Sequence, residues 1–414
     1  MTVKFITLGC KTNFYESQAM GELFRQKGYE ITETGPADVY VVNTCAVTKT
    51  GAQKSRQQIN RIKRKNPDAT VVVVGCLVQT DRESLEKLGA DVLVGSSGKN
   101  QVAELATEAL KGKKTVLVDD IMKVRDFEEL PLTSQQSRIR ANVKIEDGCD
   151  NFCAYCIIPY ARGPVRSRSL SDIKKEVELL SKNGFLEVVL TGIHIGSYGK
   201  DLKDGTSLID VIETVCSVEG IKRVRLGSIE PVVITDEFVE RIQKIPNLCP
   251  QFHLSLQSGC TKTLERMRRR YTAKEYMEGV KRLRAKIKDV SITTDLMVGF
   301  PGETDEEFLE SYEFCKEVGF MQMHIFKYSV REGTLAAKME QIPESIKEER
   351  SKKMLALAEN MKREFYDSFK GRVLEVLAEQ KTADGTYHAT APNYMEVFVE
   401  SDEDITGRIV EHTV

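Results

Sequence analysis

Short runs of apolar residues alternate with helical patterns along the first quarter of the chain. Four such runs occupy residues 5–8, 39–42, 71–74 and 91–94, and each is followed by a segment with helical spacing of its apolar positions. Continuous apolar runs are typical of strands that helices cover on both faces. We therefore predict an N-terminal α/β domain over residues 1–112, built on a parallel sheet.

The rest of the chain divides into three segments. Residues 113–138 carry mixed charges and a Ser/Gln run, which indicate a linker with one strand near residues 115–118. Residues 139–366 alternate strand-like runs with helical patterns and predict a partial (βα)6 barrel, with strands at residues 142–146, 186–190, 223–226, 252–256, 292–298 and 323–326. Residues 367–414 change to short alternating strands, which predict a small β-barrel.

Composition places the chain among soluble globular proteins. It has 414 residues, 41% of them hydrophobic and 29% charged, with a formal net charge of −2. So small a net charge does not indicate a nucleic-acid partner, which would have to be recognised by local basic patches. No basic-then-apolar leader begins the chain, and its apolar runs are far shorter than the ~18 residues of a membrane span. We therefore expect a cytoplasmic protein without a membrane partner.

The ten cysteines are candidates for metal ligands, because disulfides are rare in a reducing cytoplasm. Cys149, Cys153 and Cys156 form a CxxxCxxC motif in the loop after the first barrel strand. Three thiolates can hold three irons of a [4Fe–4S] cluster and leave the fourth iron free to bind S-adenosylmethionine (SAM). The alternatives are a zinc site or core cysteines, but no further Cys or His lies nearby in sequence to complete a four-ligand zinc site.

A second set of cysteines is dispersed in sequence but equivalent in position. Cys10, Cys45 and Cys76 each end one of three successive predicted strands. The carboxyl ends of parallel strands meet at one edge of a sheet, so we expect the three thiols to converge and to hold an auxiliary [4Fe–4S] cluster. The alternative is that each is a small buried hydrophobic residue. The remaining cysteines are given no metal role, and they are Cys216, Cys249, Cys260 and Cys315.

Loops at the ends of the later barrel strands combine glycines with polar side chains. They cover residues 191–196, 228–231, 254–259 and 298–303. Glycine lets a backbone approach a ligand closely, and Ser or Gln can hydrogen-bond the methionyl end of SAM. Alternatively, these residues only end strands, and His194 is an ordinary loop residue. We predict that SAM is held by Thr191, Gly192, Glu230, Ser255, Gln257 and Gly299.

Two basic stretches are candidates for contact with RNA phosphates. The first begins just after Cys45 and comprises Lys49, Lys54, Arg56, Arg61, Lys63, Arg64 and Lys65. The second lies just before Tyr271 and comprises Arg266, Arg268, Arg269 and Arg270. The alternative for either stretch is a solvated helix face.

The motifs of the chain together resemble those of the radical-SAM methylthiotransferase family, over nearly the whole sequence. They are Leu8-Gly9-Cys10, Asn43-Thr44-Cys45, Gly75-Cys76, residues 145–149, Cys156-Ile157-Ile158-Pro159, Arg162-Gly163, Ser167-Arg168, Gln257-Ser258-Gly259, and residues 267–272 and 299–303. The resemblance implies an N-terminal methylthiotransferase domain, a radical-SAM barrel and a C-terminal TRAM domain that binds RNA. It assigns the auxiliary cluster and the radical-SAM cluster to the two cysteine sets above.

The resemblance also implies the chemistry. A reduced cluster transfers an electron to SAM, which releases methionine and a 5′-deoxyadenosyl radical. A second SAM methylates sulfide on the auxiliary cluster, and the methylthio group is joined to carbon 2 of the adenine next to the anticodon of tRNA. An electron donor such as a flavodoxin or ferredoxin and a source of sulfide are implied as further partners.

Within the family, residues 223–231 and 254–257 resemble the branch that acts on N6-threonylcarbamoyladenosine in tRNA. The alternative substrates are isopentenyladenosine in tRNA and an aspartate of a ribosomal protein. An alternative of another class is an iron–sulfur protein that binds RNA without catalysis.

The threonylcarbamoyl group ends in a carboxylate, so its pocket should present a cation, best a bidentate arginine. The candidates are Arg225, which shares a face of its predicted strand with Arg223, and Arg166 and Arg168 just past the cysteine loop. On a barrel strand, that shared face is either the interior or the helix side.

Overall fold

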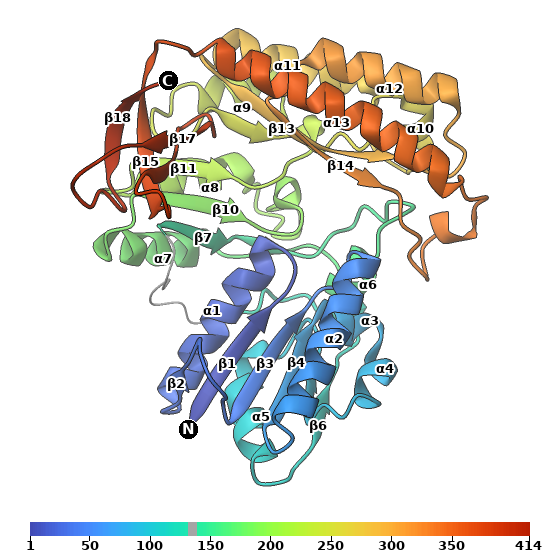
Figure 1. Ribbon diagram of the computed structural model, residues 1–414, viewed down its shortest axis with the longest axis vertical. Coiled ribbons are helices and arrows are strands. Elements are labelled where there is room, and N and C mark those ends of the chain that lie inside the picture. Colours follow the sequence, from blue (N-terminus) through green and yellow to red (C-terminus); the bar gives the residue numbers. More distant parts are fainter. Residues whose placement is uncertain (131–138) are drawn as a thin grey trace.

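The computed structural model describes residues 1–130 and 139–414, and these form three regions (Figure 1). The N-terminal α/β domain lies at one end of the molecule, and the barrel and the C-terminal sheet lie at the other. Residues 131–138, which belong to the predicted linker, lie outside the described residues. No helix within the described ranges is long and apolar enough to cross a membrane.

The N-terminal domain is built on a six-stranded parallel sheet in the order β2-β1-β3-β4-β5-β6. Its strands are β1 (Thr2–Thr7), β2 (Glu30–Ile31), β3 (Val39–Thr44), β4 (Thr70–Gly75), β5 (Val92–Val94) and β6 (Thr115–Leu117). Helices pack on both faces, with α1 (Lys11–Gln26) and α5 (Val102–Ala109) on one and α2 (Lys49–Lys65), α3 (Cys76–Thr80) and α4 (Arg82–Glu86) on the other.

The valine-rich strands β3 and β4 follow from this double cover. Val41 and Val72 belong to the apolar cluster under α1 and α5, whereas Val42 and Val73 belong to the cluster under α2 and α3. All four side chains are fully buried, so neither face of the sheet tolerates a polar alternation. Strand β6 extends this sheet into the segment predicted as a linker, because it pairs with β5 at the edge.

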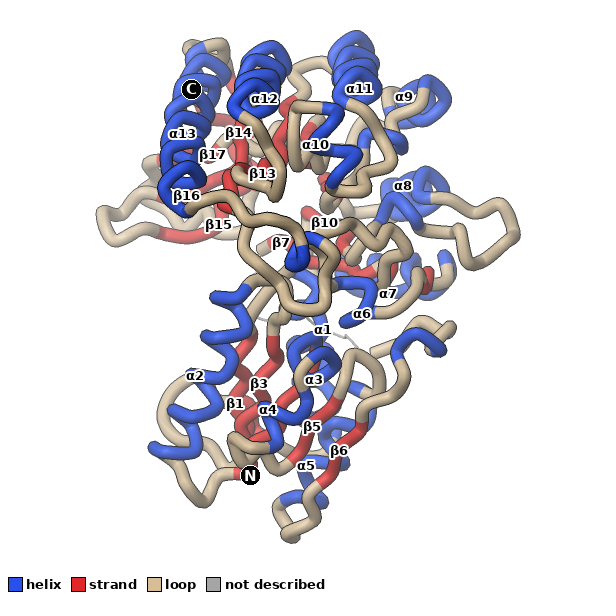
Figure 2. Tube along the Cα trace, turned by 90° about the vertical axis from the view of Figure 1, so that its right-hand side faces the viewer, coloured by secondary structure: helices blue, strands red, loops and turns tan. Residues whose placement is uncertain are grey.

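The barrel region contains six parallel strands, as the alternation of strands and helices predicts (Figure 2). Three pair in the order β11-β10-β7 and three in the order β12-β13-β14, and single bridges such as Val224–Leu248 and Ile229–Leu254 join the two halves. The resulting partial (βα)6 barrel has strands β7 (Arg140–Lys144), β10 (Glu187–Thr191), β11 (Arg223–Leu226), β12 (Gln251–His253), β13 (Ser291–Val298) and β14 (Gln322–Lys327).

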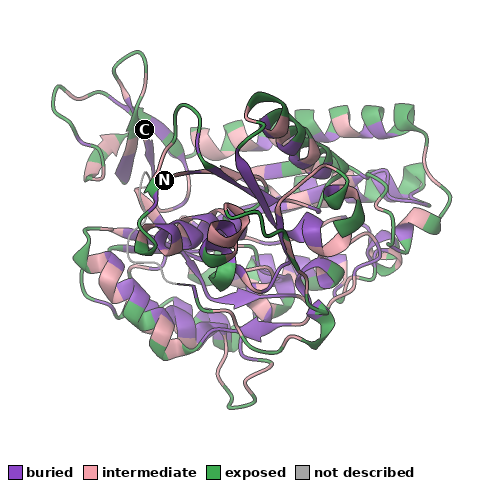
Figure 3. Cartoon of the chain, turned by 90° about the horizontal axis from the view of Figure 1, so that it is seen from below, coloured by how far each residue is buried: buried purple, intermediate pink, exposed green. Residues whose placement is uncertain are grey.

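Helices cover the outer side of this curved sheet, and their inward faces are buried (Figure 3). They are α7 (Leu170–Lys182), α8 (Leu208–Cys216), α9 (Asp236–Ile242), α10 (Thr261–Arg266), α11 (Ala273–Lys286), α12 (Asp305–Val318) and α13 (Glu344–Asp367). Between the first two barrel strands lie the short antiparallel pair β8 (Glu146–Asp147) and β9 (Arg166–Ser167) and the helix α6 (Ile158–Arg162).

The two faces of the barrel sheet differ in polarity. Val188 and Leu190 of β10 point outward into the apolar core under the helices, together with Val224 of β11. The alternate residues on the same strands point inward, and these include Glu187 and Arg225, both nearly fully buried. The interior of the barrel is therefore lined by polar groups, which suits a binding site better than a packed core.

The C-terminal region is a four-stranded antiparallel sheet in the order β17-β16-β15-β18. Its strands are β15 (Val373–Lys381), β16 (Tyr387–Thr390), β17 (Glu396–Val399) and β18 (Ile409–Thr413). The sequence pattern predicts a small β-barrel here. The structure instead has an open sheet, because β17 and β18 at its edges do not pair with each other among the described residues. A separate apolar cluster around Tyr387 and Met395 supports it.

Two arginines of β11 dock this sheet onto the barrel. Arg223 donates from its Nη atoms to the backbone carbonyls of Thr390 (2.9 Å) and Glu375 (2.8 Å). Arg225 donates to the carbonyls of Pro392 (3.0 Å) and Ala391 (3.3 Å). The face that these arginines share is thus the barrel interior, and the loop after β16 closes one end of it.

We expect the Arg225→Ala variant to loosen the loop after β16. Losing charge-assisted hydrogen bonds of this kind costs about 1.5–3 kcal/mol, so amides of residues 388–395 should exchange with solvent at least about tenfold faster. Hydrogen–deuterium exchange followed by mass spectrometry measures this. Arg241→Ala is the control, because Arg241 pairs with Glu213 at the surface. Unchanged exchange of these amides in the Arg225 variant would contradict the docking role.

Candidate active site

The first cysteine set lies at one edge of the N-terminal sheet. Cys10 follows β1 and Cys45 follows β3, and Cys76 is the first residue of α3 directly after β4. The strands β1, β3 and β4 are neighbours in the sheet, so the three residues come together as the strand-end pattern predicts. Burial raises the pKa of the Cys45 and Cys76 thiols, and the nearby Cys10 raises both further.

The second set lies in the loop between β8 and α6. The Cys156 N–H donates to the Cys153 carbonyl (2.9 Å), and the Cys149 N–H donates to the Gly163 carbonyl (2.9 Å). A side chain at Gly148 would collide with the backbone of Pro164, 1.9 Å from its carbonyl oxygen, so the turn before the first cysteine needs glycine. The loop thereby folds back on itself and gathers the three thiols.

The cysteines of the second set are buried and have hydrogen-bond donors beside their sulfur atoms. Burial raises the pKa of Cys149 and Cys156 to about 12, with a further contribution from the neighbouring thiols. Such thiols ionise only next to a positive charge, which a cluster's iron supplies. N–H groups also point at sulfur, since Ile158 donates to Cys156 Sγ (3.4 Å) and Arg269 to Cys153 Sγ (3.3 Å). Three soft ligands with such hydrogen bonds fit a [4Fe–4S] cluster with one open iron.

Arg162 joins the two cysteine sets. It is the last residue of α6, and its Nε donates to Cys76 Sγ (3.1 Å). Its Nη atoms donate to Asn13 Oδ1 (2.6 Å), Asp147 Oδ2 (3.2 Å) and the carboxylate of Glu16. The sequence does not predict these contacts of Arg162, because most of its partners lie far away along the chain.

Glu16 is the centre of the buried charges around this arginine. Its carboxylate also accepts from Lys144 (2.9 Å) and lies 3.5 Å from Lys99, and all these side chains are almost inaccessible to solvent. Burial alone would raise the pKa of Glu16, but the three cations hold it at about 2. Glu16 and Lys99 belong to the N-terminal domain, whereas Lys144 and Arg162 belong to the barrel, so the network fixes the two domains against each other.

The first predicted SAM loop packs against Glu146. Thr191 is the buried last residue of β10, and a Cβ on Gly192 would lie 2.6 Å from Glu146 Oε2. The same oxygen accepts from the backbone N–H groups of Ile193 (3.0 Å) and His194 (2.7 Å). The loop is thus held at the carboxyl end of the strand, on the side of the second cysteine set.

Glu230 and Arg269 form a pair beside this cysteine set. They are 2.6 Å apart, and Glu230 also contacts His194 (3.2 Å) and accepts from Asn151 (3.0 Å). Although burial would raise the pKa of Glu230, these contacts hold it at about 2. Arg269, predicted to contact RNA, is instead buried between Glu230, Cys153 and the ring of Tyr271. The structure places it beside the second cysteine set, and its contact with RNA stays a prediction that this burial does not favour.

The other predicted SAM residues end β12 and β13. The Ser255 carbonyl accepts from the Tyr271 hydroxyl, and the Gln257 N–H donates to the Asp295 carbonyl (2.9 Å) in a backbone with φ of +68°. The Gly299 N–H donates to Glu303 Oε2 (2.7 Å). All six predicted residues therefore lie at the carboxyl ends of barrel strands, and their contact with SAM stays a prediction.

The other predicted arginines differ in their surroundings. Arg166 donates to the carbonyls of Arg162 (2.8 Å) and Pro164 (3.0 Å), and Arg168 pairs with Glu129 (2.9 Å). Like Arg225, which bonds Glu187 Oε1 through Nε (3.0 Å), they are buried and committed to internal partners. A role in binding the substrate carboxylate stays a prediction that these contacts do not favour. In the second basic stretch, predicted to contact RNA, the exposed arginines are Arg268 and Arg270.

The basic helix α2 presents a charged surface. Arg56 pairs with Asp81 and Lys63 with Asp91 (2.6 Å), so these two basic residues are partly neutralised. The others are exposed at the side of the N-terminal domain, and they are Lys49, Lys54, Arg61, Arg64 and Lys65.

The remaining cysteines lie apart from both cysteine sets, with Cys315 in the barrel core and Cys260 donating to Glu310 (3.1 Å).

Two family models match the chain. That of the Radical SAM superfamily matches residues 143–315, and that of the Uncharacterized protein family UPF0004 matches residues 2–95. Among solved structures, the radical S-adenosylmethionine methyltransferase TsrM from Kitasatospora setae has a TM-score of 0.61 at 15% identity, covering 81% of this chain and 75% of that one. The cobalamin-dependent radical enzyme OxsB has a TM-score of 0.55 at 13% identity, covering 89% and 56%. These structures share the fold.

Sequence relatives span the whole chain. Threonylcarbamoyladenosine tRNA methylthiotransferase MtaB of Bacillus subtilis is 40% identical over 99% of this chain and 93% of the relative. Its namesake from Aquifex aeolicus is 38% identical over 99% of each chain. The tRNA-2-methylthio-N(6)-dimethylallyladenosine synthase of Acetivibrio thermocellus is 34% identical over 98% of this chain and 86% of the relative.

Fold and family models together define a radical-SAM enzyme. With relatives of 34–40% identity over nearly its full length, the chain belongs to the radical-SAM methylthiotransferase family. This confirms the enzyme class and the cofactors, [4Fe–4S] clusters and SAM, that the sequence motifs predict.

Replacing one cysteine set should remove one cluster and leave the other. The protein assembled under anaerobic conditions is expected to hold about eight irons per chain, and a variant with Cys149, Cys153 and Cys156 all changed to Ala about four. Iron analysis with Mössbauer spectroscopy measures this. Cys216→Ala on α8 is the matched control and should keep the full iron content. Two clusters in the triple variant would contradict the assignment of ligands.

Proposed function

We propose that this enzyme adds a methylthio group to carbon 2 of N6-threonylcarbamoyladenosine next to the anticodon of tRNA, giving 2-methylthio-N6-threonylcarbamoyladenosine. One observation carries the proposal. Proteins named threonylcarbamoyladenosine tRNA methylthiotransferase are 38–40% identical over 91–99% of this chain, whereas those named tRNA-2-methylthio-N(6)-dimethylallyladenosine synthase are 33–34% identical.

The chain's own residues would hold and tune the cofactors. When bound, the clusters and SAM supply the radical chemistry and the methylthio group. Cys149, Cys153 and Cys156 would bind the cluster that carries SAM, and the set at the edge of the N-terminal sheet would bind the auxiliary cluster. Arg269 and Arg162 donate N–H groups to one sulfur of each set, and their positive charge favours the reduced form of a cluster.

Other groups would position SAM and exclude water. Glu230 is ionised at neutral pH, so it can accept hydrogen bonds from an ammonium or hydroxyl group of a ligand. The loop with Ala391 and Pro392 closes the opposite end of the barrel, where Tyr394 stacks 4.9 Å from the Arg225 guanidinium. A closed end limits the access of water to a reactive radical.

The exposed basic residues of α2, together with Arg268 and Arg270, would contact tRNA phosphates. The C-terminal sheet, which is docked on the barrel, would provide a second contact with the RNA. Since tRNA modification takes place in the cytoplasm, the enzyme would act there, with a low-potential donor such as a flavodoxin or ferredoxin and a source of sulfide as partners.

The two cysteine sets are expected to have separable roles. Cys45→Ala should still cleave SAM to 5′-deoxyadenosine but form no methylthio product, because only the auxiliary cluster is disturbed. Cys153→Ala should do neither, because the open iron that binds SAM is lost. Chromatography of 5′-deoxyadenosine and of tRNA nucleosides measures both. Full product formation by the Cys45 variant would refute the role of Cys45 in binding the auxiliary cluster. SAM cleavage by the Cys153 variant would refute the role of Cys153 in binding the cluster that carries SAM.

The substrate is tested by competition between two tRNAs. One carries N6-threonylcarbamoyladenosine and the other isopentenyladenosine, at equal concentration with the loaded enzyme. We expect at least about tenfold more methylthiolation of the first, since a pocket for a charged group discriminates strongly against an apolar one. Nucleoside mass spectrometry reports both products. Equal methylthiolation, or preference for the second tRNA, would remove the substrate assignment while the enzyme class stands.

A further inference from the structure

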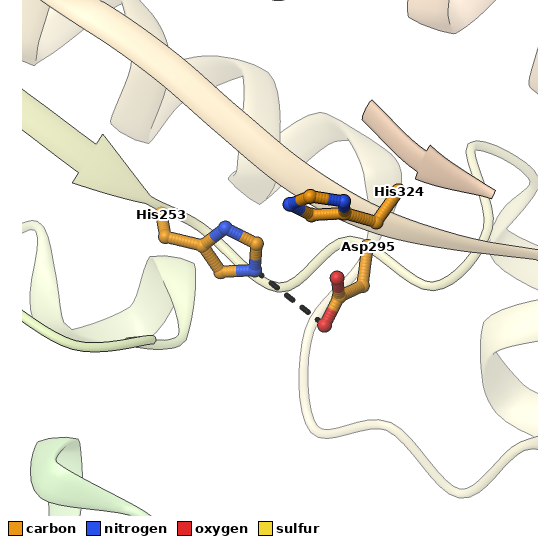
Figure 4. Close-up of side chains that lie close together, drawn as sticks. All are labelled: His253, Asp295 and His324. Atoms are coloured by element: carbon orange, nitrogen blue, oxygen red, sulfur yellow. Dashed lines mark ion pairs between the residues drawn. The ribbon is translucent and has the colours of Figure 1, made fainter. Parts of the chain in front are cut away.

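Two histidines and an aspartate meet on the inner face of the barrel (Figure 4). His253 ends β12, Asp295 lies in β13, and His324 lies in β14. Asp295 and His324 are direct partners in the β13–β14 register, whereas His253 is paired with Thr293, two residues before Asp295. The three side chains therefore share one face of three adjacent strands, and the mechanism above uses none of them.

Their ligand atoms are close enough to share one ion. One nitrogen of each histidine and one carboxylate oxygen all lie within 4.8 Å of one another. His253 Nε2 and Asp295 Oδ2 are 3.5 Å apart, close to the ~3.4 Å that a tetrahedral ion with bonds of about 2.1 Å requires. His324 is exposed, so a rotation of its side chain can complete the set.

The neighbouring side chains orient His253 as a ligand. Its Nδ1 contacts the Thr293 hydroxyl at 3.0 Å, and Gln251 donates to the same hydroxyl at 3.2 Å. Its Nε2 is buried and has no hydrogen-bond partner among the described residues, and it faces Asp295. One ring nitrogen of His253 thus has a polar neighbour, and the other faces a carboxylate at 3.5 Å without a hydrogen bond, which suits a histidine that binds a metal ion.

The cluster opens into a cavity of about 260 Å³ inside the barrel. This cavity is also lined by Ser228 and by Tyr394 from the loop that closes the barrel. Asp295 keeps 32% of its side chain exposed there, compared with 15% for His253. Bound by three side chains, an ion would therefore keep coordination positions open toward the cavity.

We infer that His253, Asp295 and His324 form a divalent transition-metal site, of the kind that Zn²⁺ or Fe²⁺ occupies, whose open positions bind the carboxylate and hydroxyl oxygens of the threonylcarbamoyl group. Two imidazoles and one carboxylate are a ligand set for such ions. This inference rests on the proposed function, because it assigns the site its substrate group. It also assigns a basis for substrate choice, since an isopentenyl group has no oxygen to coordinate.

A bound metal ion explains the position of Asp295 better than direct contact between Asp295 and the substrate does. Without an ion, the Asp295 carboxylate would face the substrate carboxylate in the same cavity, and two like charges within a few ångströms repel. Two basic residues line the same cavity, Lys11 and Arg225, and Arg225 is already paired with Glu187 and with backbone carbonyls. A divalent cation bound between the two carboxylates attracts both of them and so replaces their repulsion by attraction.

The first test measures zinc in the enzyme with both clusters assembled. After anaerobic dialysis against buffered Zn²⁺, we expect about one more Zn²⁺ per chain in wild type than in Asp295→Asn or His324→Phe. Thr293→Val should keep the ligands but weaken zinc binding about tenfold, because it removes the partner of His253 Nδ1. His412→Phe, in the C-terminal sheet, is the control and should bind zinc like wild type. Iron content measured in the same samples verifies that the clusters are intact.

Equal zinc content in wild type and in Asp295→Asn would overturn the metal site. The second test measures binding of anticodon stem-loops to the same samples. Zn²⁺ should tighten binding of the stem-loop with N6-threonylcarbamoyladenosine about tenfold, and leave the one with isopentenyladenosine unchanged. Equal affinity for the first stem-loop with and without Zn²⁺ would overturn the role of the metal in recognition.

The product assay separates this inference from the proposed function. If the loaded enzyme methylthiolates N6-threonylcarbamoyladenosine in tRNA but binds no zinc at these residues, only the metal site fails. If it forms no such product, the proposed function fails, whatever the zinc content.

Discussion

Buried ion pairs around Glu16 hold the N-terminal domain and the barrel in one relative position. Arg162 and Lys144 reach this carboxylate from the barrel, and Lys99 reaches it from the N-terminal domain. A buried charge that loses its partners costs several kcal/mol, so any other docking of the domains would leave charges uncompensated. The network thereby stabilises one arrangement of the two cysteine sets, each of which belongs to a different domain.

The inner face of the barrel follows a second constraint, because every inward residue must either find a polar partner or face a ligand. Near β11 the partners are internal, since Glu187 and the carbonyls after β16 satisfy Arg225. Near β12 to β14 the hydrogen bonds are incomplete, because the buried His253 Nε2 faces the Asp295 carboxylate at 3.5 Å and makes no hydrogen bond within the described part of the chain. The barrel is therefore divided into a half that docks the C-terminal sheet and a half that is available to a substrate.

Much of this architecture is predictable from the sequence, because periodicity and strand ends are local signals. The six barrel strands and the convergence of Cys10, Cys45 and Cys76 follow from them. Interactions between distant segments are not local, so the sequence could not show that Arg162 would donate a hydrogen bond to Cys76 or that Arg269 would donate one to Cys153. The open C-terminal sheet was missed for a similar reason, since alternation indicates strands but not whether the outer two pair.

Helix α6 determines how far apart the two cysteine sets lie. It begins two residues after Cys156, and its last residue, Arg162, donates to Cys76 Sγ. Its five residues at a rise of about 1.5 Å each span roughly 7.5 Å, so a short helix separates the two cysteine sets. If each cysteine set holds its predicted cluster, the fold itself therefore presets the distance between the two clusters.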